Sequence, residues 1–133
     1  MTSTEIVESF NNIQWHDSKL RSFGVAREAD QDNVVLHLEL RGFPDSVFTT
    51  AILTLCDATY LKAEVDLDGK FQCSDDISSA GCETESSLKE ELLRSQLKYS
   101  PTALDGYYLF DIYLIPPGGR IQVFARTFEL KRT

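Results

Sequence analysis

The sequence contains no long apolar run, and nothing in its 133 residues approaches the roughly 20 apolar residues that a membrane-spanning helix needs. Its first ten residues, MTSTEIVESF, lack the basic start and apolar stretch of a secretory signal. We therefore expect a soluble, cytoplasmic protein with no membrane partner. The 42% hydrophobic content is enough for a packed core, which predicts a single domain over residues 1–133.

Cysteine is scarce, and its spacing matches no disulfide or metal signature. The three cysteines are Cys56, Cys73 and Cys82. An odd, sparse set does not resemble a secreted disulfide framework, although Cys73 and Cys82 could pair in an oxidising setting. No second pair of zinc ligands lies near them. We expect structural thiols and no cofactor.

Positive charge is also in short supply, above all in the middle of the chain. The formal net charge is −8, and residues 57–91 contain ten acidic side chains against three lysines. Such a field repels phosphate backbones, so nucleic-acid binding is disfavoured. It can steer a basic protein partner, or it can simply keep the surface solvated. The composition indicates no oligomeric state.

Apolar periodicity predicts an α+β fold, mainly antiparallel β-sheet, arranged as a curved sheet or a sandwich. Residues 2–13 have the spacing of a short helix that Thr2 or Thr4 can cap. Alternation with period two then predicts a hairpin of strands, with a bulge near Arg21. The segments expected in chain order are strands at 18–27, 34–41, 47–56 and 60–67, a surface loop at 72–86, a helix at 87–98, and a hairpin of 106–115 with 120–131.

The two middle strands have distinct patterns. Residues 47–56 are apolar on both faces, which is typical of a central strand. Residues 60–67 alternate, so Leu61 and Ala63 should face inward, and Asp68-Gly69 should close a tight turn after them.

The most distinctive motif is Trp15-His16-Asp17-Ser18, which contains the three residue types of a hydrolytic triad. In a triad the histidine contacts the nucleophile while a carboxylate orients the imidazole. Neighbours in an extended chain point to opposite faces, so His16 and Asp17 should not form that relay with each other. The only other histidine, His37, falls on the polar face of its strand, and there is no G-x-S-x-G nucleophile elbow.

A structural role accounts for the same motif. Trp15 can seal the core, while His16 and Asp17 hydrogen-bond backbone groups that the start of a strand leaves unpaired. The alternative is a small hydrolase with His16, Asp17 and His37 at a cleft. The motif therefore leaves enzymatic activity open, but the sequence favours a non-catalytic protein.

An acidic ion-binding domain is a further hypothesis. Asp66 and Asp68 lie two residues apart, and Asp75 and Asp76 follow them. An EF-hand loop would need an oxygen ligand at position 70, which is a lysine, and a glutamate late in the loop. A hairpin turn is therefore preferred, and Asp75 and Asp76 remain as the only metal candidates.

Candidate partner-binding residues come from two regions. Tyr107 and Tyr113, with Asp111 between them, fall on the outward face of an expected strand, and tyrosine-rich faces are common in interfaces. Packing of these tyrosines beneath a helix is the alternative. Glu64 and Asp66 belong to the acidic region that would meet a basic protein. The leading hypothesis is a non-catalytic protein-binding module.

The run W-H-D-S-x-L resembles the immunity protein 50-like group of uncharacterised small bacterial proteins. The matching residues are 15–18 and Leu20, and the resemblance covers the first half of the chain. At 12–14, where that group has Trp-Pro-Ser, this chain has Asn-Ile-Gln. The resemblance implies an antiparallel-sheet domain that binds and neutralises a partner protein without catalysis.

Overall fold

The computed structural model describes residues 2–28, 30–42, 44–65, 76–95, 100, 102–115 and 118–133. In chain order its elements are α1 (Ser3–Asn11), β1 (Lys19–Arg27), β2 (Asp32–Arg41), β3 (Phe48–Cys56), β4 (Tyr60–Val65), β5 (Ile77–Glu83), α2 (Ser87–Arg94), β6 (Tyr108–Leu114), β7 (Gly119–Ala125) and β8 (Thr127–Arg132). The described strands pair antiparallel in two sheets, ordered β1-β2-β3-β8 and β4-β7-β6-β5. The predicted α+β fold is confirmed.

Two neighbouring strands pass from one sheet to the other at the same place. β3 pairs with β8 and β4 pairs with β7, and only Asp57–Thr59 and Arg126 interrupt these two runs. At this bend Asp57 has a φ of 54°, and the Arg126 amide donates to the carbonyl of Cys56 at 3.0 Å. Arg126 Nε also lies 3.1 Å from the Asp57 carboxylate. The two sheets are therefore halves of one antiparallel ladder that is folded back on itself.

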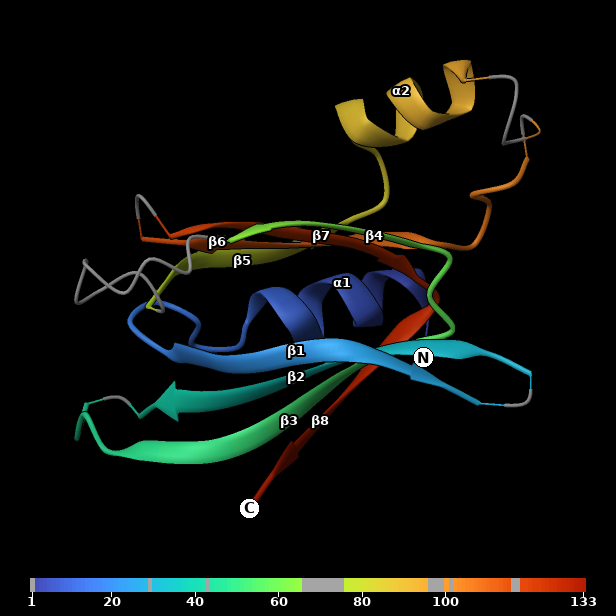
Figure 1. The fold of residues 1–133 in the computed structure, drawn as a ribbon. Helices are drawn as coiled ribbons and strands as arrows, with labels where there is room; N and C mark the ends of the chain where they lie inside the picture. The colour runs from blue at the N-terminus through green and yellow to red at the C-terminus, as the bar shows by residue number, and fades with distance from the viewer. Residues whose placement is uncertain are drawn as a thin grey trace.

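Helix α1 lies between the two halves (Figure 1). Thr2 caps it, as predicted, and its side chains Ile6 and Phe10 are buried. The ring centroid of Phe10 lies 5.0 Å from that of Phe110 on β6 and 5.2 Å from that of Phe128 on β8. One aromatic side chain thus contacts both sheets, in the edge-to-face geometry that aromatic rings prefer.

The predictions for the first sheet are confirmed. β1 and β2 form a hairpin whose register shifts between Leu20 and Ser22, which is the expected bulge. β3 lies between β2 and β8, as expected for a central strand. The inward-facing residues of β2 are all buried, namely Val34, Leu36, Leu38 and Leu40.

Residues 72–86 were predicted to form a surface loop, and this prediction is wrong for 77–83, which form a strand. β5 forms inside that segment, pairs with β6 and buries Ile77 completely. A register shift between Ile77 and Ser79 breaks the alternation, and small polar residues on the outer face resemble a loop in composition. The remaining part of the loop, and the Asp68-Gly69 turn, lie outside the described residues.

One strand prediction near the bend needs correction. The strand expected over 120–131 ends at Ala125, and the chain resumes in the other sheet at Thr127. The core-facing positions shift by one residue there, from Ile121, Val123 and Ala125 to Phe128 and Leu130. Phe124 on the outer face hides this shift in the sequence, because it continues the spacing of Phe128 and Leu130.

Ala63 was expected to face inward, and it lies opposite the buried Ile121 and between Leu61 and Val65, which pack against the core. It is nevertheless exposed, because β4 is an edge strand with one neighbour.

Helix α2 covers one end of the outer face of the second sheet (Figure 1). Ser86 caps it by accepting the Lys89 amide at 3.1 Å. Leu88 packs with three buried residues beneath the helix: Leu104, Leu109 and Phe124. α2 ends at Arg94 with Ser95 as its C-cap, and the last part of the expected helix, residues 96–98, lies outside the described residues. Among the described residues, no helix has both the length and the apolar character to cross a membrane.

Gly119 is the backbone position at which the fold tolerates a side chain least. Its φ is 117°, and a Cβ atom there would lie 1.8 Å from the carbonyl oxygen of Glu64. We expect Gly119→Ala to lower the free energy of unfolding by about 2 kcal/mol or more, through strain and a backbone clash. Gly24→Ala is the control, because no atom lies within 4 Å of its Cβ position. Urea unfolding that ranked the two variants equally would contradict this expectation.

Candidate functional site

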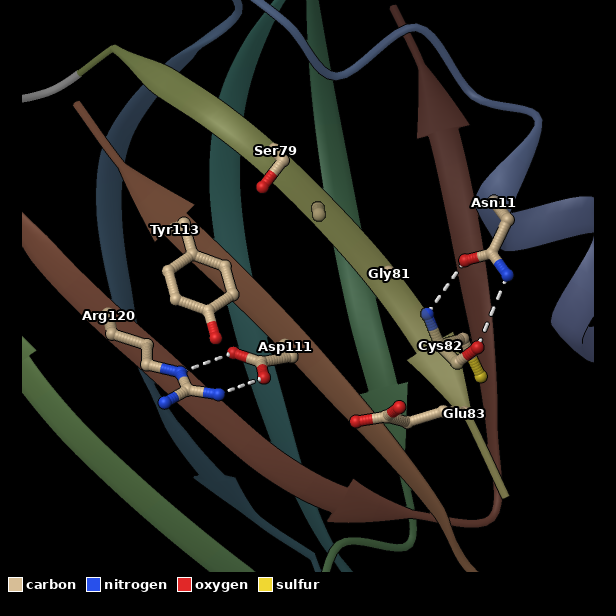
Figure 2. A pocket seen from close by; sticks show the side chains of 9 residues that line it. Asn11, Ser79, Gly81, Cys82, Glu83, Asp111, Tyr113 and Arg120 are labelled. Carbon is tan, nitrogen blue, oxygen red and sulfur yellow. Dashed lines mark hydrogen bonds and ion pairs between the residues drawn. The ribbon is translucent and has the colours of Figure 1, made fainter. Parts of the chain in front are cut away.

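The outer face of the second sheet is open at the end that α2 leaves uncovered. Polar side chains from three strands meet there: Asp111 and Tyr113 from β6, Arg120 from β7 and Glu83 from β5 (Figure 2). The register explains the grouping, because Tyr113 lies opposite Arg120 and Asp111 lies opposite Gly81. These residues line an open pocket of about 430 Å³.

The central interaction of this pocket is a two-pronged ion pair. Arg120 donates to Asp111 through Nε at 2.9 Å and through Nη2 at 2.6 Å (Figure 2). The Asp111 side chain is only 9% exposed. The two hydrogen bonds from Arg120 therefore replace the water that this carboxylate loses on burial. The same hydrogen bonds raise the pKa of Arg120, which stays charged.

The ion pair also fixes an exposed aromatic ring. The guanidinium carbon of Arg120 lies 4.4 Å from the ring centroid of Tyr113, a cation–π contact. Tyr113 is 40% exposed, so one face of the ring is held while much of its surface stays open. A buried aspartate thus positions an arginine, and the arginine positions a surface tyrosine.

Two acidic side chains, Glu83 and Glu64, flank this unit on either side. Neither Glu83 nor Glu64, which lies opposite Arg120 on β4, forms an ion pair within the described part of the chain. Partial burial raises the pKa of Glu83, and the negative charge of Asp111 adds to this, while Arg120 lowers it. The site therefore offers an aromatic surface flanked by carboxylates that, among the described residues, are not engaged in an ion pair.

Asn11 closes the side of the pocket at the sheet edge. Its amide accepts a hydrogen bond from Cys82 N at 2.7 Å and donates to Cys82 O at 3.2 Å, as a neighbouring strand would (Figure 2). The Cys82 thiol is buried, and burial, with a smaller effect of Glu83, raises its pKa to about 12. A protonated, buried thiol is a packing group rather than a nucleophile. Cys73 lies outside the described residues.

The structure separates the partner-binding candidates. Asp111, Tyr113 and Glu64 come together on the outer face, whereas Tyr107 packs against the cluster beneath α2 with Arg126 over its ring at 4.3 Å. Asp66 lies outside the described residues. Sequence reasoning missed two residues of the site. Arg120 needed the β6–β7 register, and Glu83 was hidden because its segment resembles a loop.

The histidine-containing motif lies elsewhere and joins the two ends of the folded sheet. The Asp17 amide donates to the carbonyl of Ile77 at 2.9 Å, and the Ile77 amide donates to the carbonyl of Ser18 at 2.6 Å. Beside them Lys19 and Asp76 form an isolated bridge and an ion pair of 2.6 Å. This set of contacts, which we call the closure (residues 15–18 with Ile77 and Ser78), ties the start of β1 to the start of β5.

Trp15 and Ser18 are the interior residues of the closure. Trp15 is buried, as predicted, and its indole donates to the carbonyl of Phe10 at 2.9 Å. Ser18 is fully buried, accepts the Arg41 amide at 2.9 Å and donates to the carbonyl of Gln14 at 3.2 Å. The Ser18 hydroxyl is therefore committed to backbone groups, which leaves it unsuited to act as a nucleophile.

His16 and Asp17 are arranged differently from the expectation. Asp17 has a φ of 64°, so the chain is not extended there, and His16 Nε2 lies 3.5 Å from the Asp17 carboxylate. The expectation that these two side chains form no relay rested on an extended chain at this point, and that premise is wrong. His16 Nδ1 donates to the carbonyl of Ser78 at 3.1 Å, while Asp17 also binds Arg41 at 2.6 Å.

The motif faces an open pocket of about 260 Å³. The His16 side chain is 65% exposed in it, and Ser46 accepts a hydrogen bond from Arg41 at 3.0 Å. His37 lines a different pocket, on the outer face of β2. In the described part of the chain no serine, threonine or cysteine side chain hydrogen-bonds to His16.

The metal candidates do not form a site among the residues that the structure describes. No group of three or more histidine, cysteine, aspartate or glutamate side chains there could hold an ion. Asp76 is engaged by Lys19, and Asp75 lies outside the described residues.

The contacts of the closure predict which of two alanine substitutions destabilises the protein more. Ser18→Ala removes a fully buried hydroxyl and leaves the partly buried Arg41 amide without its partner, so it should cost about 1–3 kcal/mol of unfolding free energy. His16→Ala removes one bond of a largely exposed ring and should cost less than about 1 kcal/mol. Chemical denaturation of both variants checks the order. A larger loss in His16→Ala would contradict it.

The raised pKa of Glu83 predicts that removing its charge stabilises the folded protein at neutral pH. Because its pKa is raised in the folded state, the folded protein binds the proton more tightly, and stability falls as pH rises from the ordinary glutamate pKa through the raised one. Glu83→Gln should therefore raise the Tm at pH 7.5 and change it little at pH 3.5. Glu64→Gln, on the exposed β4 edge, is the control and should show a smaller gain. An unchanged Tm of Glu83→Gln at pH 7.5 would refute this.

Comparison with protein-family models, with curated proteins and with solved structures found no match to this chain. The resemblance of the Trp-His-Asp-Ser motif to the immunity protein 50-like group thus stays a prediction. What the chain does has to be inferred from its own side chains.

Proposed function

We propose that this chain is a non-catalytic binding module that recognises a basic segment of a partner protein. The binding surface is the open outer face of the second sheet around Tyr113. One observation carries the proposal: an exposed tyrosine ring is held in place by Arg120 and the buried Asp111, between two carboxylates that form no ion pair in the described part of the chain.

The physical reason lies in the cost of ordering side chains on binding. An aromatic side chain that is already fixed loses little conformational entropy when a partner covers it, and tyrosine is enriched among residues that dominate binding energy. Tyr113 meets this condition because Arg120 is itself anchored by two hydrogen bonds. The buried Asp111 thus contributes to partner binding indirectly, because it holds the arginine that fixes Tyr113.

Charge indicates what kind of segment fits. The carboxylates of Glu64 and Glu83 can each accept a lysine or arginine from a partner, and pairing would relieve the unfavourable ionisation of Glu83. The net charge of −8 would also accelerate association with a basic protein. A narrower role follows from the resemblance of the Trp-His-Asp-Ser motif: the partner would be a protein that this module neutralises, as expected of an immunity-like domain.

A second candidate is a small hydrolase at His16. The contact of His16 with Asp17 at 3.5 Å and the open pocket in front of them favour it. It ranks second because no nucleophile is bonded to the imidazole in the described part of the chain. Hydrolysis of p-nitrophenyl acetate that disappears in His16→Ala would support this candidate. An equal rate in both proteins would remove it.

The binding proposal predicts both the composition of selected ligands and the effect of one substitution. Panning a random phage-displayed peptide library on the protein should enrich peptides rich in lysine and arginine. Tyr113→Ala should weaken the binding of such a peptide about tenfold or more, measured by calorimetry. The fold should survive this change because the ring is exposed.

Phe48→Ala is the matched control, since Phe48 is 44% exposed on the other sheet. It should leave the affinity unchanged. Enrichment of neutral or acidic peptides, or an equal loss of affinity in the two variants, would refute the proposal.

A further inference from the structure

The folded ladder has four edge strands, and three of them are guarded. The edge of β5 is covered by backbone bonds from Ser18, by His16 at the carbonyl of Ser78, and by the Asn11 amide at Cys82. β4 is short and carries exposed charges, and β8 is likewise charged; the side chains concerned are Lys62, Glu64, Glu129, Lys131 and Arg132. Short, charged or covered edges are the usual devices that prevent sheets from pairing with other chains.

Between the charged residues Arg21 and Arg27, the edge of β1 has none of these devices. The four residues 23–26, Phe-Gly-Val-Ala, carry no charge, and Val25 is 48% exposed. In the described part of the chain β1 has one full partner, β2, and its only other pairing is the bridge of Lys19 with Asp76. This edge is therefore open where it is least polar.

The hairpin geometry shows which backbone groups face this edge. Glu28 donates its amide to the carbonyl of Gln31 at 3.0 Å, and bonded and non-bonded pairs alternate along an antiparallel ladder. Every second residue before Glu28 is thus bonded to β2. The intervening residues, whose N–H and C=O groups point outward, are Arg27, Val25 and Phe23. Consistently, the carbonyl of Asp32, opposite Arg27, turns away from β1 and accepts the Ala58 amide at 2.7 Å.

These outward groups are arranged symmetrically about Val25. If a second β1 strand pairs antiparallel across a two-fold axis at this residue, Val25 meets the partner's Val25, and Phe23 meets the partner's Arg27. The exposed valines then cover each other, and the guanidinium lies near an aromatic ring. Between them Gly24 faces the partner's Ala26, where small side chains allow close approach.

The charges along this hairpin complement a second copy in the same register. β1 begins with Lys19 and Arg21, whereas Glu28 and Asp30 follow its end. Within the chain Lys19 already pairs with Asp76 and Arg21 with Glu39. An antiparallel arrangement adds the acidic turn of the second copy beside this basic start, twice. We infer that the β1 edge is a self-association surface, through which two copies of this chain form a symmetric dimer with a continuous eight-stranded sheet.

The dimer should be weak and reversible, because pairing over about five residues buries less surface than a stable interface needs. It uses strands of the first sheet only, so it leaves the Tyr113 surface free. Binding of a basic segment and dimerisation are therefore separate properties, and either could fail alone.

Sedimentation velocity over a wide range of protein concentration tests the inference. The parent should shift from monomer to dimer as concentration rises, and Val25→Lys should raise the dimer Kd about tenfold or more by placing a charge on the open edge. Ala63→Lys, an exposed position on the β4 edge, is the matched control and should leave the dimer unchanged. Glu28→Lys should also weaken the dimer, since it removes the complementary charge.

Thermal unfolding of each variant confirms that the monomer stays folded, which is expected because Val25 is half exposed. Hydrogen exchange adds a local readout, since the Val25 amide should gain protection in the parent at high concentration. A monomer at every concentration would overturn the inference. A dimer that resists Val25→Lys, or one that Ala63→Lys weakens equally, would assign association to another surface and overturn it as well.

Discussion

The pair of main-chain hydrogen bonds between Asp17, Ser18 and Ile77 is the constraint on which the rest of this structure depends. A ladder folded back at Asp57 and Arg126 has two distant ends, the strands β1 and β5, which nothing in the bend itself brings together. The closure joins them, and with α1 between the halves it encloses the core around Phe10. It also covers the β5 edge, so that edge protection and core formation come from the same few residues.

On the candidate binding surface, a buried carboxylate holds an exposed aromatic side chain in place through an arginine. Asp111 would be costly in this position without Arg120, and Arg120 would be mobile without Asp111. Together they hold Tyr113 while its outer surface stays accessible. Glu83 lies beside this unit in an environment that disfavours its ionised form, which is a small loss of stability at neutral pH. In the proposed binding function, a partner's cation would relieve that loss.

The Trp-His-Asp-Ser motif shows why residue types alone do not define a catalytic site. The left-handed backbone of Asp17 brings its carboxylate near His16, an arrangement that a catalytic relay would use. Yet Ser18 is turned inward to the Arg41 amide and to Gln14, and Asp17 is shared with Arg41. The same three side chains thus hold a strand start in place: His16 binds the carbonyl of Ser78, Asp17 binds Arg41, and Ser18 binds two backbone groups.

The sequence by itself determined the fold class, α1, the β1–β2 hairpin with its bulge, and the central position of β3, because each depends on local periodicity and turn residues. It also placed Tyr113 and Asp111 on an outward face, since alternation decides the face of a strand. Only the tertiary structure decided the bend at Arg126, the strand at 77–83 and the partners of Asp111 and Ser18. These depend on contacts between segments far apart in the chain, such as Ile77 with Ser18, and on a positive φ at Asp17, none of which leaves a periodic signal in the amino-acid sequence.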